Sequence, residues 1–395
     1  MRPRAGTLAP RTTRSGRIRC AIRCACLVTV CLLWLPWQVL AQEEPADKPA
    51  DSEPGVVPDI REHKVPLKVR KGSWVAVPIP FSNPTLGTGL VAAVGHFHAQ
   101  TAEQKAAQPP SVTGAGVLWS ESDNLAVAVG NASYWGGDTW RFKGALAWAD
   151  LNLPLSTDGS GSDPAELDWS IEGAFVYTEI ARRIRGDWYL GVRARYMDVQ
   201  QAINGDVSSD NLLVADQIVA SGLGLSLEYD TRDLPSNAYQ GRHFTASALF
   251  NDQALGSDDD YGVYAAEFTS YHHLRKPFVL AWTVSACARS GDVPLWDACR
   301  LSLRGAAATD YMGRSALQAK AEGRWHFSPR WGAVLFSGAG QITDPLVEAQ
   351  NHDVIANYGA GIRFMVSKEN RINLRLDYGR TRDDSAVVLA VGEAF

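Results

Sequence analysis

Very few residue patterns in this chain have the types and spacing that enzyme chemistry requires. The sequence has no Gly-x-Ser-x-Gly nucleophile motif and no histidine pattern typical of metal hydrolases. His272 and His273 are adjacent, and adjacent strand residues point to opposite faces, so these side chains cannot bind one metal. The acidic run Asp258–Asp260 is either a calcium loop or a solvated acidic tip. We expect no catalytic residue, no metal site and no cofactor, and hydrolysis is the least favoured function.

The first 41 residues have the composition of a secretory signal peptide. Seven arginines lie between Arg2 and Arg23 with no acidic residue among them, and an apolar stretch follows from Ala25 to Leu40. We expect cleavage after Ala41; an uncleaved anchor is the alternative. The whole chain has a net charge of −5, and removing seven arginines leaves −12, which disfavours nucleic acid as a partner.

Removal of the signal peptide leaves a lead-in segment, a folded domain and two cysteines to explain. Residues 42–75 are rich in acidic residues and proline, which predicts a disordered lead-in before a folded domain over residues 76–395. Four of the six cysteines lie in the signal segment, which leaves Cys287 and Cys299. In an oxidising compartment this pair is a candidate disulfide, and two free buried thiols are the alternative.

The folded domain reads as a series of two-faced strands. In the runs 357–366 and 371–378, apolar residues alternate with polar or small ones, and similar runs occur from Trp140 onward. The last run leads through Val387, Leu389 and Val391 to Phe395. Short alternating strands that end on an aromatic residue predict an all-β fold, a transmembrane antiparallel β-barrel of the bacterial outer membrane.

The connections between the runs support this interpretation. Short and long connections alternate, and the long ones are 200–216, 251–259, 291–313 and 341–353. Bacterial barrels have short periplasmic turns and longer outer loops, so we expect both termini on the periplasmic side. About fifteen strands can be marked, and because single-chain barrels have even numbers we expect sixteen, with fourteen as the alternative. A soluble β-sandwich or lipocalin-like barrel is disfavoured, because charged residues occupy the second face of many strands.

Several segments resemble one known family. The run Tyr229–Asp233, followed by Pro235 and Gly241, resembles the periplasmic turn of the BamA/TamA superfamily, also called the bacterial surface antigen family. Other segments with similar motifs follow in order, and the resemblance covers Thr85 to Phe395. These segments are Leu303-Arg304-Gly305, Ala321–Arg324 with its Glu322, Gly359–Phe364, Leu374–Gly379 and Gly392–Phe395.

The resemblance implies a long loop folded into the barrel lumen. In this family the arginine at the loop tip, here Arg304 beside Gly305, pairs with an inward glutamate, here Glu322; a solvated arginine is the alternative. Two positions depart from the family pattern. The expected aromatic residue after Arg-Gly is Ala306, and the expected aspartate on the next strand is Gly338, so Asp377 is a candidate substitute.

Two further roles are predicted at the periplasmic rim. Asp230 and Arg232 lie two residues apart at a strand end and can pair, so together with Asp233 and Gly241 they form a candidate structural turn. An ordinary polar turn is the alternative. The terminal Phe395 resembles the signal by which assembly machinery recognises a new barrel.

The resemblance also bears on function. Insertases of the family carry POTRA domains before the barrel, and the residues between Gln42 and the first clear run near Gly87 are too few for one, which suggests a subgroup with the barrel alone. The implied function is outer-membrane protein or lipid biogenesis or translocation; a passive channel or surface antigen with a plug loop is the alternative. The implied partners are outer-membrane lipid, lipopolysaccharide, the barrel assembly machinery and client barrels, for a monomeric protein.

Overall fold

The computed structural model describes residues 72–156, 166–204, 212–235, 237–345, 354–368, 371–382 and 384–395. The predicted signal peptide, its cleavage site near Ala41 and the lead-in up to residue 71 lie outside the described residues. No helix in the described part of the chain is long and apolar enough to cross a membrane.

Antiparallel strands account for most of the described residues. The elements in chain order are β1 (Ser73–Asn83), β2 (Gly87–Phe97), α1 (Ala102–Ala107), β3 (Val112–Ser120), β4 (Leu125–Trp135), β5 (Trp140–Ser156), β6 (Glu166–Arg185), β7 (Trp188–Asn204), β8 (Leu212–Asp230), β9 (Gly241–Asn251), η1 (Gln253–Leu255), β10 (Tyr261–Arg275), β11 (Phe278–Gly291), η2 (Leu295–Asp297), β12 (Cys299–Arg300), β13 (Met312–Trp325), β14 (Trp331–Pro345), β15 (Ile355–Ser367), β16 (Ile372–Arg380) and β17 (Ser385–Val391).

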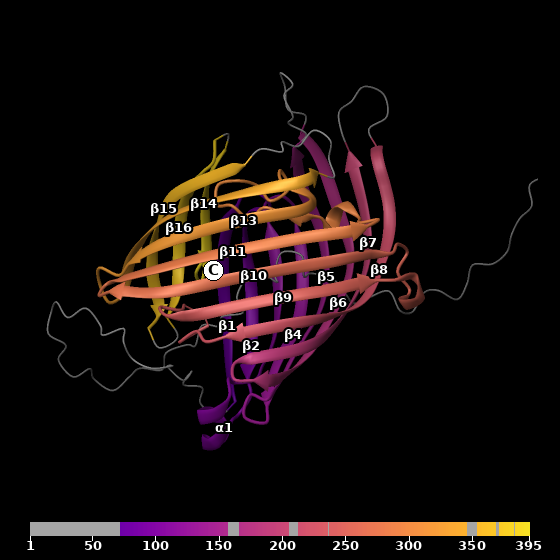
Figure 1. Cartoon of the computed structure of the whole chain (residues 1–395). Helices are drawn as coiled ribbons and strands as arrows, with labels where there is room; N and C mark the ends of the chain where they lie inside the picture. The colour runs from indigo at the N-terminus through magenta and orange to yellow at the C-terminus, as the bar shows by residue number, and fades with distance from the viewer. Residues whose placement is uncertain are drawn as a thin grey trace, which may run out of the picture.

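These strands form a closed barrel (Figure 1). Each long strand pairs with the next in the chain, and β17 pairs with β1. The two-residue β12 pairs with β13 inside the β11–β13 connection, so sixteen strands make up the wall among the described residues. The predicted transmembrane barrel of sixteen strands is therefore confirmed.

The alternation seen in the sequence separates an outer face from an inner face. On β16, Leu376 and Tyr378 are each 48% exposed, whereas Asp377 between them is fully buried. Successive strand residues point to opposite sides, so the apolar set faces lipid and the charged set faces the lumen. This arrangement matches the predicted alternation of an apolar outer face with a charged inner face.

The connections lie on two rims. The rim that carries the connections 231–240, 276–277 and 326–330, and the chain end, is called here the turn rim, and the opposite one the loop rim. The β2–β3 connection of residues 98–111 departs from the expected length asymmetry, because it lies on the turn rim and contains α1. This is the part of the chain, before Trp140, in which the sequence did not define the strands clearly.

Strands β5 to β8 are longer than a membrane requires. The longest, β6, has 20 residues. At about 3.3 Å per residue it extends roughly 65 Å, about twice the ~30 Å hydrocarbon thickness. These strands rise beyond their neighbours at the upper right of Figure 1. Exposed acidic residues near their loop-rim ends, such as Asp168 and Glu172, fit a position in water.

The barrel closes at a seam between β1 and β17. Among the described residues, one residue pair joins the two strands, Ser82 with Leu389. By contrast, β1 pairs with β2 over 11 positions, and β17 pairs with β16 over 7. The first and last strands lie side by side but are paired at far fewer positions than other neighbours are.

The glycine at the start of β9 makes a testable contribution to this fold. Gly241 has a φ of +111°, and a Cβ atom there would lie 2.3 Å from the Thr231 carbonyl oxygen. Gly256, in the next connection, has a φ of +90° but no atom within 4 Å of such a Cβ. We expect Gly241→Ala to lower the free energy of unfolding by at least about 2 kcal/mol, and Gly256→Ala by about 1 kcal/mol. Urea unfolding of the folded barrel measures both, and equal effects would contradict the tight packing of this turn.

Candidate functional site

One row of side chains crosses the inner wall. Directly opposed residues on neighbouring strands point to the same side of a sheet. The fully buried Glu322 lies on the inner face, so its partners along the row do too. The row runs from β10 to β16 through Tyr271, Ala281, Glu322, Phe336, Gly359 and Gly379.

A cluster of charges lies along this row. It comprises four arginines and three carboxylates and is called here the inner charge cluster: Arg304, Arg324, Arg363, Arg375, Glu322, Asp377 and Glu393. Asp377 and Glu322 have no exposed surface. Buried carboxylates require close cationic partners, and both have them.

Asp377 is paired with three guanidinium groups. Its carboxylate oxygens lie 2.5 Å from Arg363, 3.0 Å from Arg304 and 3.2 Å from Arg375. Arg363 and Arg375 are directly opposite one another on β15 and β16, so the carboxylate also offsets their mutual repulsion. The candidate substitute carboxylate suggested by the sequence thus lies against Arg304.

Arg304 also contacts Glu322. One guanidinium nitrogen is 2.6 Å from Glu322 Oε1, an ion pair outside ideal hydrogen-bond angles, and Arg324 Nε donates to the other oxygen at 3.0 Å. The guanidinium carbon lies 3.4 Å from the centroid of the Phe336 ring, a close cation–π contact. The family pattern has an aromatic residue at the position of Ala306. In this chain the aromatic ring that stacks on Arg304 is that of Phe336, on β14.

Two glycines make room for the loop tip. Gly305 has a φ of +105°, and its backbone packs against Gly379, where a Cβ would lie 2.4 Å from the Arg304 carbonyl oxygen. At Gly359, a Cβ would lie 2.3 Å from the Phe336 ring. The glycines of the inner face therefore permit both the backbone approach and the ring position. Asn357 donates to the Arg304 carbonyl at 2.8 Å, which holds the tip further.

The same connection is attached at a second place. Asp297 in η2 forms an ion pair with Arg195 of β7 and a second, at 3.3 Å, with Arg289 of β11. Burial raises the pKa of the Asp297 carboxyl, but the two guanidinium groups more than offset this and hold the pKa below its ordinary value. Cys299, two residues beyond Asp297, forms a disulfide with Cys287 of β11.

The predicted turn residues contact each other and the opposite side of the rim. Arg232 pairs with Asp230 at 2.8 Å, as the spacing suggested. Asp233 accepts from the Tyr239 backbone at 3.0 Å and pairs at 2.6 Å with Arg371, which belongs to the β15–β16 connection. The β8–β9 turn is therefore joined to a turn seven strands further along the chain. Nothing in the sequence pattern pointed to Arg371.

The chain end turns inward, in contrast with the expected continuous strand. β17 ends at Val391, and Gly392 has a φ of +89°. Glu393 then accepts from Arg363 at 2.9 Å, and Phe395 packs against the cluster formed by Ala238, Tyr271 and Ala281. The predicted role of Phe395 as an assembly signal stays a prediction, and it concerns the extended form of these last residues.

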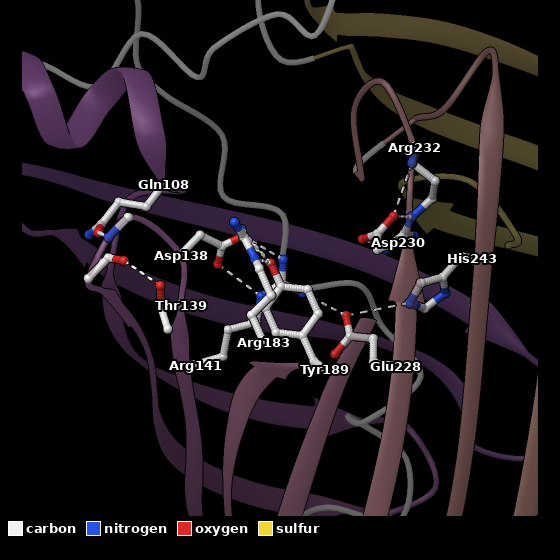
Figure 2. A network of polar contacts seen from close by, with 12 residues as sticks. Gln108, Asp138, Thr139, Arg141, Arg183, Tyr189, Glu228, Asp230, Arg232 and His243 are labelled. Atoms are coloured by element: carbon white, nitrogen blue, oxygen red, sulfur yellow. Dashed lines mark hydrogen bonds and ion pairs between the residues drawn. The ribbon is translucent and has the colours of Figure 1, made fainter. Parts of the chain in front are cut away.

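A second polar network lies on the wall from β5 to β9 (Figure 2). Asp138, in the β4–β5 turn, accepts from Arg141 at 2.8 Å, from Arg183 at 2.9 Å and from the Tyr189 hydroxyl at 2.6 Å. Arg141 also pairs with Glu228 of β8 at 3.0 Å. These contacts tie four strands and a turn together near the turn rim.

Part of this network has the residue types of a metal site. Glu228, Asp230 and His243 place ligand atoms within 4.8 Å of one another. Glu228 is already paired with Arg141 and with Lys143, at 3.2 Å, and Asp230 is paired with Arg232. Three cations thus supply the charge that a metal would supply, and we assign no metal role to this group.

Comparison of the sequence with models of protein families assigns this closed barrel to a family. The model of the Omp85 superfamily domain matches residues 131–385, which is 255 of the 395 residues. The chain belongs to the Omp85 superfamily. BamA and CdiB are members of this superfamily, so the resemblance noted in the sequence is confirmed, and the described residues of this Omp85 barrel include no POTRA region.

Solved structures show the same fold. BamA from Haemophilus ducreyi lacking POTRA domains 1–3 superposes with a TM-score of 0.56 at 11% identity, over 82% of this chain and 70% of that one. CdiB from Escherichia coli gives 0.55 at 10% identity, over 82% and 63% of the two chains. CdiB from Acinetobacter baumannii gives 0.53 at 9%, over 82% and 60%. No curated protein sequence matches this Omp85 barrel.

The inner charge cluster makes a stability prediction. Arg304→Ala leaves Glu322 and Asp377 buried with less compensation, so we expect the free energy of unfolding to fall by about 3–5 kcal/mol. Arg314→Ala is a matched control, because Arg314 pairs at 3.5 Å with Asp344, whose side chain is 68% exposed; its loss should cost less than about 1 kcal/mol. Urea unfolding measures both, and similar losses would contradict the buried pairing.

A second prediction concerns pH. Asp310 lies in the β11–β13 connection, where burial and the nearby Asp384 raise its pKa to about 6. The folded connection therefore favours the protonated Asp310 side chain. The stability that protonation adds to the connection is complete below the ordinary pKa of an aspartate and is lost as the pH rises through about 6. We expect backbone hydrogen exchange at 307–311, corrected for intrinsic rates, to be several-fold slower at pH 5 than at pH 7.5. Asp310→Asn should remove this dependence, and an unchanged dependence would rule out Asp310 as its source.

Proposed function

We propose that this barrel works in outer-membrane biogenesis or translocation, by admitting an extended strand, or by altering local bilayer order, at the β1–β17 seam. In the described part of the chain these two strands are paired at one position only, Ser82 with Leu389, and this supports the proposal. In hydrocarbon, an unpaired backbone N–H or C=O costs several kcal/mol, so a seam paired at one position is a site where the wall can accept another strand.

Membership of the Omp85 superfamily also supports a role in outer-membrane biogenesis or translocation. Omp85 barrels are outer-membrane proteins, and BamA-like and CdiB-like members act in outer-membrane protein insertion or secretion. The orientation with the turn rim in the periplasm, the monomeric state, and the partners (lipopolysaccharide, the assembly machinery and client barrels) belong to this proposal.

A second candidate is a passive channel or surface antigen in which the β11–β13 connection is a plug. The observation that favours it is that this connection is attached to β7 through Asp297 and to β16 through Arg304. Strands β7 and β16 are separated by many others in the sheet order, so the segment between the two contacts bridges distant parts of the wall. Five of the seven residues of the inner charge cluster are buried, and the other two, Arg304 and Arg375, are mostly covered, which fits a closed lumen.

One experiment separates these functions. Vesicles that contain the full protein are mixed with an unrelated, urea-unfolded outer-membrane barrel, and the rate at which that barrel folds is measured. We expect several-fold acceleration over empty vesicles. The variant Ser82→Cys with Leu389→Cys, whose positions are directly opposed, should lose the acceleration when oxidised and regain it on reduction.

The wild-type protein with the same reductant controls for reduction of Cys287–Cys299. In planar bilayers, a plugged channel would show ohmic conductance that rises on Arg304→Ala, without any acceleration of folding. Absence of both acceleration and conductance would contradict both functions.

A further inference from the structure

A cavity at the turn rim gathers positive charge at the end of β10. Its volume is about 760 Å³, and it is lined by Gln240 and by residues 271–276. Arg275 and Lys276 are both exposed there, and the described residues that line the cavity include no acidic side chain. The Arg275 guanidinium carbon lies 5.7 Å from the centroid of the Phe278 ring on β11. The cavity therefore offers cationic groups to an anionic ligand.

The lipid-facing residues next to this cavity are also polar. Tyr271 belongs to the inner row, so its neighbours Ser270 and His272 face lipid. Ser270 is directly opposite Arg242 of β9 and Trp282 of β11, which therefore share its face. The Trp282 indole N–H donates to His272 Nε2 at 3.3 Å. Tryptophan and cationic side chains together are typical of the bilayer interface, where lipid headgroups lie.

Farther from the rim, the same strands form an apolar groove. Strands β8 to β11 are neighbours in the wall (Figure 1), and a cavity of about 400 Å³ lies along them. The outer face there has a row of directly opposed alanines on β9, β10 and β11: Ala246, Ala266 and Ala286. The row is flanked by Leu227 of β8 and by Leu317 of β13, which is 58% exposed. Small residues between longer ones leave a depression in which an alkyl chain can pack.

The spacing of the rim cavity and the alanine groove matches one phospholipid. Ala266 lies six residues from His272, which at about 3.4 Å per residue is roughly 20 Å along β10. With a strand tilt of about 40°, this length corresponds to roughly 15 Å of depth, which is half of the ~30 Å hydrocarbon core. A lipid with its phosphate in the rim cavity therefore places its chains over the alanine groove.

We propose that β9–β11 hold one anionic glycerophospholipid, with its phosphate in the rim cavity and an acyl chain in the alanine groove. Arg275 and Lys276 offset the charge of the phosphate, and Arg242 lies in the same interfacial zone. The occupant is a lipid of the leaflet next to the turn rim, because such a lipid carries an anionic group and alkyl chains at this spacing. The site lies away from the β1–β17 seam and does not rest on the proposed function.

The first test removes the cations. The full protein in detergent micelles is titrated with phosphatidylglycerol, and native mass spectrometry gives the dissociation constant of the first lipid bound. Arg275→Gln combined with Lys276→Gln should raise this constant at least about fivefold.

The matched control is Arg182→Gln combined with Arg185→Gln, at the β6–β7 turn of the same rim. Both arginines are exposed, and Arg182 lies 5.3 Å from the Trp140 ring, so the control removes equal charge outside the cavity. It should change the constant by less than about twofold. Equal effects of the two double variants would show that any interfacial arginine acts alike and would overturn the site.

The second test separates the lipid from its parts. Phosphatidylglycerol should bind at least about tenfold more tightly than a diacylglycerol with the same chains, and excess inorganic phosphate should not displace it. Diacylglycerol binding of equal strength would assign the site to the chains alone. Displacement by phosphate would assign it to a free anion. Either result would overturn the proposal.

The third test fills the groove. Ala266→Leu places a longer side chain in the alanine row and should raise the dissociation constant for phosphatidylglycerol at least about threefold. Ala360→Leu is the control, because Ala360 is an exposed alanine on β15, outside the groove; it should leave the constant unchanged. Heat-modifiable migration checks that each variant is a folded barrel. An unchanged constant in folded Ala266→Leu would show that no chain lies in the groove.

Discussion

The pairing of the buried Asp377 carboxylate with three guanidinium groups is the interaction on which the rest of the interior depends. A barrel in lipid must turn its charges inward, and an inward charge without a partner costs several kcal/mol. Asp377 meets this constraint by joining β15, β16 and the tip of the β11–β13 connection. Through Arg363 and Arg324, the same charges extend to Glu393 and Glu322, so the chain end and the loop are held by one network.

The seam between β1 and β17, unlike the interior, has few paired groups. Elsewhere in the wall, strand pairing is extensive and satisfies the backbone, whereas β1 and β17 share one pair. The inward turn at Gly392 takes the last residues of the chain away from β1 and into the inner charge cluster. A closely paired charge cluster and a sparsely paired seam therefore occur side by side, and the residues after Gly392 that contribute to the cluster are withdrawn from the wall.

Much of the fold was predictable from the sequence because membrane strands follow a strict rule of alternation. The runs 357–366 and 371–378 predicted which residues face lipid, and parity alone places Arg363 and Arg375 on the side of Asp377. Arg304, Glu322 and Asp377 could be named from family motifs. The contacts of Phe336 and Arg371 could not, since the first depends on where the loop tip lies and the second on which turns face each other across the rim. The inward turn at Gly392 was hidden because Phe395 fits a continuing strand equally well, and α1 is too short to give a helical period.

Arg304 and Asp377 are in direct contact inside the barrel, so their effects on stability should be coupled. A double-mutant cycle with Arg304→Met, Asp377→Asn and the combined variant, followed by urea unfolding in vesicles, measures that coupling without counting each side chain's other contacts. We expect a coupling free energy of at least about 1.5 kcal/mol, because Asp377 is fully buried and the paired atoms lie 3.0 Å apart. A coupling free energy indistinguishable from zero would show that the loop tip does not bind Asp377.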